Sequence, residues 1–510
     1  MTNLIDKVLN RVTMYRLVLY YLIFLVVAAV ALSLFGLLPF QPVDLLVSIS
    51  VLVFVCWISN SILAKVFNVP ANAESLYITA FILALLITPP SPARSFAAGS
   101  AFVVWAGVSA MASKYILAIR RQHIFNPAAL AVALSAFTLN RAAGWWVGTF
   151  TMMPFVLAGG LLVARKIARF GLVLSFLAAA CAVNLGASLA KGTGVLPAAG
   201  QFFAETPILF FAFVMLTEPL TSPAERTPRI VYGAMVGFLF APSLHVGRVY
   251  STPELALLAG NALSYLMSPK ARYVLKLRAK TQLAHGVYDF RFAADRRLRF
   301  RPGQYLEWTL RHSRPDSRGN RRYFTIASSA AEREVRIGVK FHLEASSFKR
   351  SLLAMRPGDE IVASQLAGEF VLPADKRAKL VFMAGGIGIT PFRSMIKHLL
   401  DHDERRPIAV LYSNRTAPEI VYTDVLEEAR RRLGIETVYT LTDANNVPPD
   451  WQGGTGRVDA AMIAKTVPDY RERTFYLSGP RSLVAGFEEV LRNIGIPKSR
   501  IKTDFFPGFA

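Results

Sequence analysis

The sequence of 510 residues contains only two cysteines, Cys56 and Cys181, and each lies inside an apolar segment. Two distant cysteines cannot supply a four-thiolate iron–sulfur cluster, a CxxC redox pair or a cysteine-rich zinc site. Histidine is also scarce, because only His123 and His245 of the seven histidines precede residue 270. A haem between helices needs facing pairs of axial histidines, so two distant ones argue against it. We therefore expect no metal site.

Acidic residues are outnumbered, with 34 Asp and Glu against 57 Lys and Arg. Such an excess can indicate a nucleic-acid partner, but here much of it flanks long hydrophobic runs. The flanking basic residues are Lys7, Arg11, Arg16, Arg120, Arg121, Arg165, Lys166, Arg169, Lys270, Arg272 and Lys276. Basic residues beside hydrophobic spans set the orientation of a membrane protein. We therefore expect contact with membrane lipid and no nucleic-acid partner.

Charge is rare from about residue 16 to 268, which predicts a multi-pass α-helical membrane domain with about ten spans. The expected spans are roughly 17–38, 43–64, 75–90, 97–115, 126–139, 148–164, 171–190, 206–220, 230–243 and 252–268. The N-terminus has no small-residue cleavage site, so we expect the first span to be retained. An even number of spans puts both termini on one side. The basic residues place that side in the cytoplasm, at a bacterial inner membrane.

The expected membrane domain contains an internal repeat. Residues 85–94, LLITPPSPAR, resemble residues 215–226, MLTEPLTSPAER, and a helix opening with proline follows each of them, at Pro127 and at Pro253. Two five-span halves would be related by inverted topology. Prolines at matching places in two such halves indicate a midplane site for a substrate, an ion or a cofactor. Alternatively, these prolines only kink packed helices.

The strings HIFNPAALAVAL (123–134) and FAFVMLTEPLTSPAERTPRIVYGAMVGFL (211–239) resemble a family of membrane proteins. These are subunits B and D of the sodium-pumping NADH:quinone reductase and the Rnf electron-transport complex. The family's covalent flavin motif, Ser-Gly-Ala-Thr, is absent from this sequence, so we expect no covalent FMN. Glu218 stands where the family has Asp before Pro. It is either an intramembrane functional carboxylate or a cap at the water interface.

The C-terminal half is organised around residues 379–396, KLVFMAGGIGITPFRSMI. An apolar run at 380–383 predicts a buried strand, and a helix is expected from Pro391 to about His398, with Thr390 as its N-cap. A glycine-rich turn before a helix lets backbone N–H groups approach a pyrophosphate. The residues expected to bind the dinucleotide in this turn are Gly385, Gly386, Gly388, Thr390 and Pro391.

A second segment carries an expected flavin site. Arg322, Phe324 and Thr325 fit the Arg-x-Tyr/Phe-Ser/Thr pattern of the ferredoxin–NADP reductase-like superfamily, which this half resembles. The resemblance implies that Arg322 holds the FAD pyrophosphate and that Thr325 hydrogen-bonds the flavin, with Tyr323 and Phe324 beside it. Ser346 and Ser347, just before a helix-like run, are expected to bind the FAD phosphates.

Two further segments complete the resemblance. Ser413, Asn414 and Arg415 follow the next buried strand, where a doubly wound sheet contacts the adenosine ribose. Arg415 could read a 2′-phosphate, stack on adenine or face solvent, so NADH and NADPH remain open with a lean to NADH. The turn Ser478-Gly479-Pro480 and the terminal Phe505 and Phe506 are expected near the nicotinamide and flavin rings.

The predicted domains are a transmembrane domain (1–269), a flavin-binding β-barrel (270–376) and a doubly wound α/β nucleotide-binding domain (377–510). We expect an NAD(P)H-dependent flavoprotein oxidoreductase with catalytic residues Thr325, Ser478 and Phe506. Electrons would pass from NAD(P)H through FAD to a quinone, a flavin or a separate redox partner. The alternative is a redox-driven ion pump or transporter that the flavoprotein powers or regulates.

Overall fold

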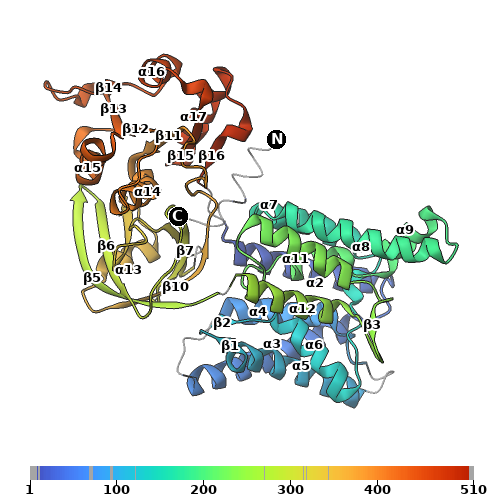
Figure 1. Cartoon of the computed structure of the whole chain (residues 1–510). Coiled ribbons are helices and arrows are strands. Elements are labelled where there is room, and N and C mark those ends of the chain that lie inside the picture. The colour runs from blue at the N-terminus through green and yellow to red at the C-terminus, as the bar shows by residue number, and fades with distance from the viewer. Residues whose placement is uncertain are drawn as a thin grey trace. The chain divides into compact units, whose positions relative to one another are not determined.

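A computed structural model describes residues 9, 12–67, 73–91, 96–120, 122–268, 270–313, 315–316, 319–342 and 344–504. The chain divides into two compact units, Met1–Arg272 and Tyr273–Ala510 (Figure 1). The first unit is helical and the second contains two six-stranded sheets.

The first unit is built from apolar helices around one hydrophobic core. Its longer elements are α2 (Met14–Leu34), α3 (Pro42–Val66), α4 (Ala73–Leu86), α5 (Phe96–Ile116), α6 (Pro127–Leu139), α7 (Met153–Lys166), α8 (Phe170–Ala190), α9 (Val195–Glu205), α11 (Arg226–Leu239) and α12 (Pro253–Met267). The short α10 (Ile208–Phe210) continues into a π-helical turn at Phe211–Met215. An alanine Cβ at Gly237 would stand 2.4 Å from the Phe176 carbonyl oxygen, so this glycine allows α11 to pack closely on α8.

The prediction of about ten spans is wrong as a count of membrane-crossing helices. A helix overlaps each predicted span, but only α2, α3 and α8 are long and apolar enough to cross a membrane among the described residues. A fourth is possible if α9 and the segment Ile208–Met215, which meet at a 66° bend, form one span. For the shorter helices the reason is length, since helices of 13 to 15 residues such as α6 and α12 extend only about 20 Å, less than the hydrocarbon core.

The predicted helix starts at the two repeated prolines are confirmed. Helix α6 begins at Pro127 and α12 begins at Pro253, each after an extended N-cap residue. The N-cap side chains of Asn126 and Thr252 accept hydrogen bonds from the backbone N–H groups of Ala129 and Leu255. Short hairpins, β1–β2 (Ala118–Ile119, Gln122–His123) and β3–β4 (His245–Val246, Val249–Tyr250), precede the two helices. The inverted relation between the halves stays a prediction.

The second unit opens with an antiparallel sheet in the order β8-β7-β10-β5-β6-β9. Its elements are β5 (Tyr273–Ala284), β6 (Val287–Ala294), β7 (Tyr305–Thr309), β8 (Arg321–Thr325), β9 (Val335–Lys340) and β10 (Glu360–Ala367), with helix α13 (Ser347–Ala354) after β9. Ala327, just after β8, donates its backbone N–H to the carbonyl of Arg336 in β9 at 2.8 Å. This bond joins the two ends of the strand order, so the sheet curls on itself as a barrel does.

A fully parallel sheet follows, in the order β14-β13-β12-β11-β15-β16. The strands are β11 (Leu380–Gly385), β12 (Ile408–Asn414), β13 (Glu436–Leu441), β14 (Gly454–Thr455), β15 (Thr474–Ser478) and β16 (Ile501–Thr503). The helices are α14 (Thr390–Asp401), α15 (Thr423–Leu433), α16 (Ala460–Thr466) and α17 (Arg481–Asn493).

The alternation of side chains along β11 explains why both faces of this sheet are covered. Leu380 and Phe382 belong to a core shared with α14 and α15, whereas Val381 and Met383 belong to a core shared with α16 and α17. The strand order reverses between β11 and β15. The carboxyl ends of these two strands therefore form the switch point at which doubly wound sheets bind ligands.

Candidate functional site

The glycine turn after β11 and the turn after β15 touch each other at this switch point. An alanine Cβ at Gly388 would stand 2.5 Å from the Gly479 Cα and from the Ser478 carbonyl oxygen. Gly479 has a φ of +151°, and a Cβ there would stand 3.1 Å from the Gly385 Cα. Glycine is therefore required at both turns, because any side chain at Gly388 or Gly479 would collide with the facing turn.

The start of the helix after the glycine turn differs from the prediction. Residues Gly386–Ile389 form a 3₁₀ turn, and α14 begins at Thr390, one residue earlier than predicted. The Thr390 hydroxyl donates to the Ile387 carbonyl at 3.1 Å and makes no capping bond. The predicted N-cap role of Thr390 is wrong, because its hydroxyl donates to a carbonyl of the preceding 3₁₀ turn instead of accepting from an N–H of the helix. Pro391 still lies in the first turn of the helix, where its missing N–H has no partner to lose.

Two predicted catalytic hydroxyls, from different sheets, converge on one carboxylate. Thr325 at the end of β8 and Ser478 at the end of β15 each donate to Oδ2 of Asp504, both at 3.4 Å. The Thr325 and Ser478 residues are 5% and 4% exposed. Sequence reasoning missed Asp504 as a member of this site, although its place directly before the predicted aromatic pair was the available signal. Phe505 and Phe506 lie outside the described residues.

A cluster of polar side chains surrounds the N-terminus of α13. Both serines were predicted just before the helix; Ser346 is its N-cap, with a hydroxyl that accepts from the Lys349 N–H at 3.3 Å, and Ser347 is its first residue. The Asp316 carboxylate accepts the Ser347 N–H at 2.9 Å and lies 3.6 Å from Nη2 of Arg322. His312 lies 3.1 Å from the Ser347 hydroxyl. The helix N-terminus and the buried Arg322 guanidinium thus bind the Asp316 carboxylate. A pyrophosphate is bound by the same two kinds of group.

The side chains of β8 alternate between two environments. Arg322 and Phe324 lie on the face that packs against Phe348, with the guanidinium carbon 5.3 Å from the Phe348 ring centre. Tyr323 points to the other face and donates its hydroxyl to Glu307 at 2.9 Å. Phe324 is buried in the core of the sheet, so the aromatic residue that the pattern places beside the flavin is a core residue in this structure.

The predicted ribose-binding residues lie at the carboxyl end of β12. Ser413 and Asn414 are buried at the end of β12. The side chain of Arg415 is 74% exposed, and its Nε lies 3.4 Å from Oδ2 of Asp443. Sequence reasoning also missed Asp443, because its partner lies on a neighbouring strand.

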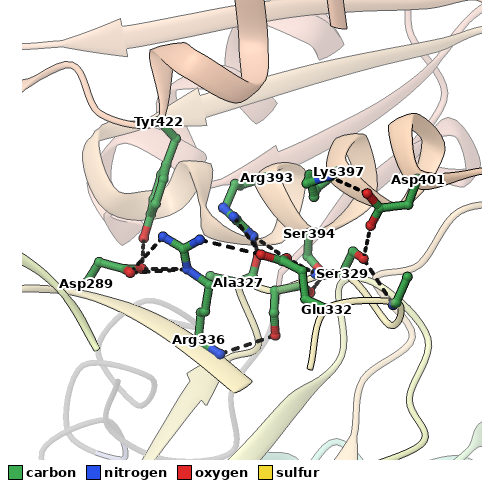
Figure 2. A network of polar contacts seen from close by, with 12 residues as sticks. Asp289, Ala327, Ser329, Glu332, Arg336, Arg393, Ser394, Lys397, Asp401 and Tyr422 are labelled. Atoms are coloured by element: carbon green, nitrogen blue, oxygen red, sulfur yellow. Dashed lines mark hydrogen bonds and ion pairs between the residues drawn. The ribbon is translucent and has the colours of Figure 1, made fainter. Parts of the chain in front are cut away.

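A network of ion pairs and hydrogen bonds joins the antiparallel sheet to the helices beside the parallel sheet (Figure 2). Asp289 of β6 accepts hydrogen bonds from Arg336 Nη2 at 2.8 Å and from the Tyr422 hydroxyl at 2.9 Å. Glu332 accepts from Arg393 of α14 at 2.8 Å and 3.1 Å. Burial alone would raise the pKa of Glu332, but the hydrogen bonds and charge of Arg393 outweigh it and hold the pKa below its usual value. The network fixes the relative position of the flavin-side and nucleotide-side residues.

Comparisons with known proteins bear on this unit. Residues 382–489 match the family described as the oxidoreductase NAD-binding domain. The glycine betaine monooxygenase reductase subunit of Pseudomonas aeruginosa is 24% identical over 246 residues, which is 46% of this chain and 64% of that protein. NADH-cytochrome b5 reductase 1 of Aspergillus terreus is 27% identical over 270 residues, 49% of this chain and 89% of that protein. The C-terminal half is thus similar to reductases that use FAD and NAD(P)H, and we call it the reductase module.

Two further similarities concern the reductase module. One subunit of the Na(+)-translocating NADH-quinone reductase of Idiomarina loihiensis is 28% identical over 175 residues, 32% of this chain and 41% of that protein. A solved FAD/NAD-binding domain of nitric oxide dioxygenase from Vibrio cholerae is 20% identical with a TM-score of 0.41, over 46% of this chain and 98% of that one. The chain thus spans less than two thirds of several of these relatives. The resemblance of the helical unit to membrane subunits stays a prediction.

The residues present fit the two nucleotides. The cluster of Arg322, Ser346 and Ser347 offers a cation and a helix N-terminus to the FAD pyrophosphate. The turns at Gly388 and Gly479 lie at the switch point, where the second dinucleotide would bind. Among the described residues, no group of three or more His, Cys, Asp or Glu side chains is placed to hold a metal ion. These features match those of the NAD(P)H-dependent flavoprotein reductases to which the module is similar.

Proposed function

We propose that this protein is a membrane-bound reductase that passes electrons from NAD(P)H through FAD to an acceptor in the membrane, a quinone or a second flavin. The observation that carries the proposal is the convergence of Thr325 and Ser478 on Asp504. These residues come from the flavin-side sheet and the nucleotide-side sheet, so the two cofactor rings would meet where the three side chains meet.

The side chains of the site have separate tasks in this proposal. FAD, when bound, would supply the hydride-accepting redox chemistry. Thr325 orients the flavin edge with its hydroxyl, and Ser478 orients the nicotinamide, while Asp504 holds both hydroxyls in place. Arg322 and the α13 N-terminus bind the pyrophosphate, which fixes the ring against Thr325. Burial of the two hydroxyls keeps water away from the reacting atoms.

A membrane acceptor is supported by the other half of the chain. Three of the described helices, α2, α3 and α8, are long and apolar enough to span a membrane. A relative of the reductase module is part of an NADH-quinone reductase. A hydrophobic acceptor would dissolve where these helices lie, so fusion of the two units would bring the reductase to its oxidant.

The experiment uses the full chain, purified in detergent and placed in lipid vesicles with or without a lipid-soluble quinone. NADH oxidation should be fast with the quinone and with ferricyanide, a soluble dye. Thr325→Val should slow both reactions at least about tenfold with FAD still bound, because a positioning hydroxyl is lost. Thr437→Val is the matched control, since the Thr437 hydroxyl has no hydrogen-bond partner among the described residues. Oxidation by the dye alone, never by a quinone, flavin or membrane, would reject the membrane acceptor.

A second candidate is a redox-driven ion pump, and one cluster in the helical unit favours it. Glu218 accepts hydrogen bonds from Asn126 Nδ2 at 2.8 Å and from the Thr221 hydroxyl at 3.1 Å, and His123 lies 3.8 Å away. A carboxylate held by polar groups from both repeated segments is placed as an ion site would be. Ion flux into vesicles should then follow NADH addition and disappear in Glu218→Gln. Flux equal in both proteins would exclude this candidate.

A further inference from the structure

Two opposite charges lie side by side at the carboxyl ends of neighbouring parallel strands. Arg415 follows β12 directly, and Asp443 comes two residues after β13. The backbone fixes their register, because Asp443 donates its N–H to the Arg415 carbonyl at 3.1 Å and Thr442 donates to Asn414 at 2.9 Å. Nε of Arg415 lies 3.4 Å from Oδ2 of Asp443. A ligand that reaches one of these side chains therefore meets the other.

The carboxylate is the fixed member of the pair. Asp443 Oδ2 accepts from the Asn446 side-chain amide at 3.0 Å, and Oδ1 accepts from the Asn445 N–H at 3.2 Å. Its side chain is 15% exposed, whereas that of Arg415 is 74% exposed. The Asn446 amide, with the Asn445 N–H and the Arg415 charge, holds the pKa of Asp443 below its usual value, against the effect of desolvation. Asp443 therefore carries a negative charge throughout the neutral pH range.

This pair lies where the adenosine end of a dinucleotide belongs. In a doubly wound sheet the pyrophosphate binds at the first turn, here the glycine turn after β11, and the adenosine ribose lies over the end of the next strand, here β12. A ribose 2′-hydroxyl can donate a hydrogen bond to a carboxylate at that place. A 2′-phosphate would be drawn to Arg415 and would then stand against the fixed carboxylate, which repels it.

We infer that Asp443 makes the reductase module select NADH over NADPH, and that Arg415, already paired with Asp443, does not serve as a 2′-phosphate site. The inference rests on the proposed use of NAD(P)H by this module and adds the nucleotide that it takes. Among residues 413–416 and 441–446, Arg415 is the sole basic residue, so the segment provides no second cation to offset Asp443.

The test measures kcat/KM of the full chain, loaded with FAD, for NADH and for NADPH with ferricyanide as the oxidant. We expect a preference for NADH of about tenfold or more, the size of effect that one adjacent like charge produces. Asp443→Asn keeps an acceptor oxygen for the turn and removes the charge. It should raise kcat/KM for NADPH about tenfold, by lowering KM for NADPH. Glu489→Gln, an equal charge change at an exposed position of α17, should leave the ratio unchanged. Adding Arg415→Ala to Asp443→Asn should abolish the gain, because the freed guanidinium is what would bind the phosphate.

A second measurement does not depend on hydride transfer. Adenosine 2′,5′-bisphosphate and 5′-AMP are compared as competitive inhibitors against NADH. The first should bind more weakly than the second in the natural protein and more tightly in Asp443→Asn. A natural preference for NADPH, or a ratio that Asp443→Asn does not move, would overturn the inference and leave the proposed function standing. Failure of both nucleotides to reduce the FAD-loaded protein would overturn both.

Discussion

Replacing Arg336 with methionine should destabilise the reductase module strongly, because it leaves a buried carboxylate without its cation. Asp289 is 1% exposed and accepts from Arg336 Nε at 3.1 Å and Nη2 at 2.8 Å. In Arg336→Met the carboxylate keeps only the Tyr422 hydroxyl as a side-chain donor among the described residues. Methionine retains most of the arginine stem, so the change removes charge and hydrogen bonds more than packing.

The expected magnitude follows from the burial of Asp289. Breaking a buried ion pair by removing one partner costs about 3–5 kcal/mol, and the remaining Tyr422 hydroxyl favours the lower end of that range. For a unit of this size each kcal/mol lowers the melting temperature by about 2–4 °C, so a loss of about 3 kcal/mol corresponds to roughly 6–12 °C. The double variant Asp289→Asn, Arg336→Met should be less destabilised than Arg336→Met, because no unpaired charge remains.

Heating the full chain in detergent while recording flavin fluorescence reports this unfolding, since released FAD fluoresces more strongly than stacked, bound FAD. Arg430→Met is the matched control, because Arg430 pairs with Glu427 at the surface with side chains 51% and 46% exposed. The control should cost less than about 0.5 kcal/mol and shift the midpoint by less than about 2 °C. Equal midpoints for the Arg336 and Arg430 variants would refute the reasoning about the buried network.

Three further predictions concern the network and the two nucleotide sites. The Glu332 pKa is lowered in the folded protein, so the contribution of this carboxylate to stability is complete above the unfolded pKa of about 4.3 and is lost as the pH falls through the lower folded value. Unfolding midpoints recorded from pH 7 to about pH 3 should therefore fall less steeply in Glu332→Gln, and identical slopes would contradict this. Arg322→Met should weaken FAD binding about 10- to 150-fold, the equivalent of losing one charge-assisted hydrogen bond, measured as flavin retained after gel filtration and restored by added FAD; full retention would exclude a pyrophosphate contact. Gly388→Ala should raise KM for NADH at least about tenfold with FAD retained, because its Cβ would collide with backbone atoms of Gly479. The matched Gly486→Ala, with no atom within 4 Å, should leave KM unchanged, and equal KM values in both variants would count against the role of the turn.

The sequence predicted the parts of the fold that have a strong local pattern. The buried strand at 380–383, the helix after the glycine turn and the proline-led helices at Pro127 and Pro253 each follow from periodicity or capping. The number of membrane-crossing helices did not follow, because apolar composition does not show where a helix breaks, as it does near Pro207 between α9 and α10. Hydropathy gives the length of an apolar run in the sequence. Whether a helix crosses the membrane depends on the length of that helix, which is shorter where the run contains a break.

In the candidate site, too, residues within short motifs were predicted, whereas residues that depend on tertiary contacts were missed. Arg322, Thr325 and Ser478 were predicted from short motifs, and the structure brings the last two together. Asp504 and Asp443 were missed because their partners lie 179 and 28 positions earlier in the sequence, on other strands. Tertiary ion pairs of this kind leave no periodic signal. The period of two along β8 places Phe324 on the same face as Arg322, and its predicted place beside the flavin stays a prediction.

The most direct test of electron transfer through FAD into the membrane is an anaerobic titration of the purified full chain in lipid vesicles. The bound flavin is first released from a sample and identified. NADH is then added until the flavin absorbance is bleached, and a lipid-soluble quinone is added last. We predict that the flavin is FAD, that NADH bleaches it and that the quinone restores its colour. A protein whose flavin NADH does not reduce, or whose reduced flavin neither quinone nor added flavin reoxidises, would contradict this account.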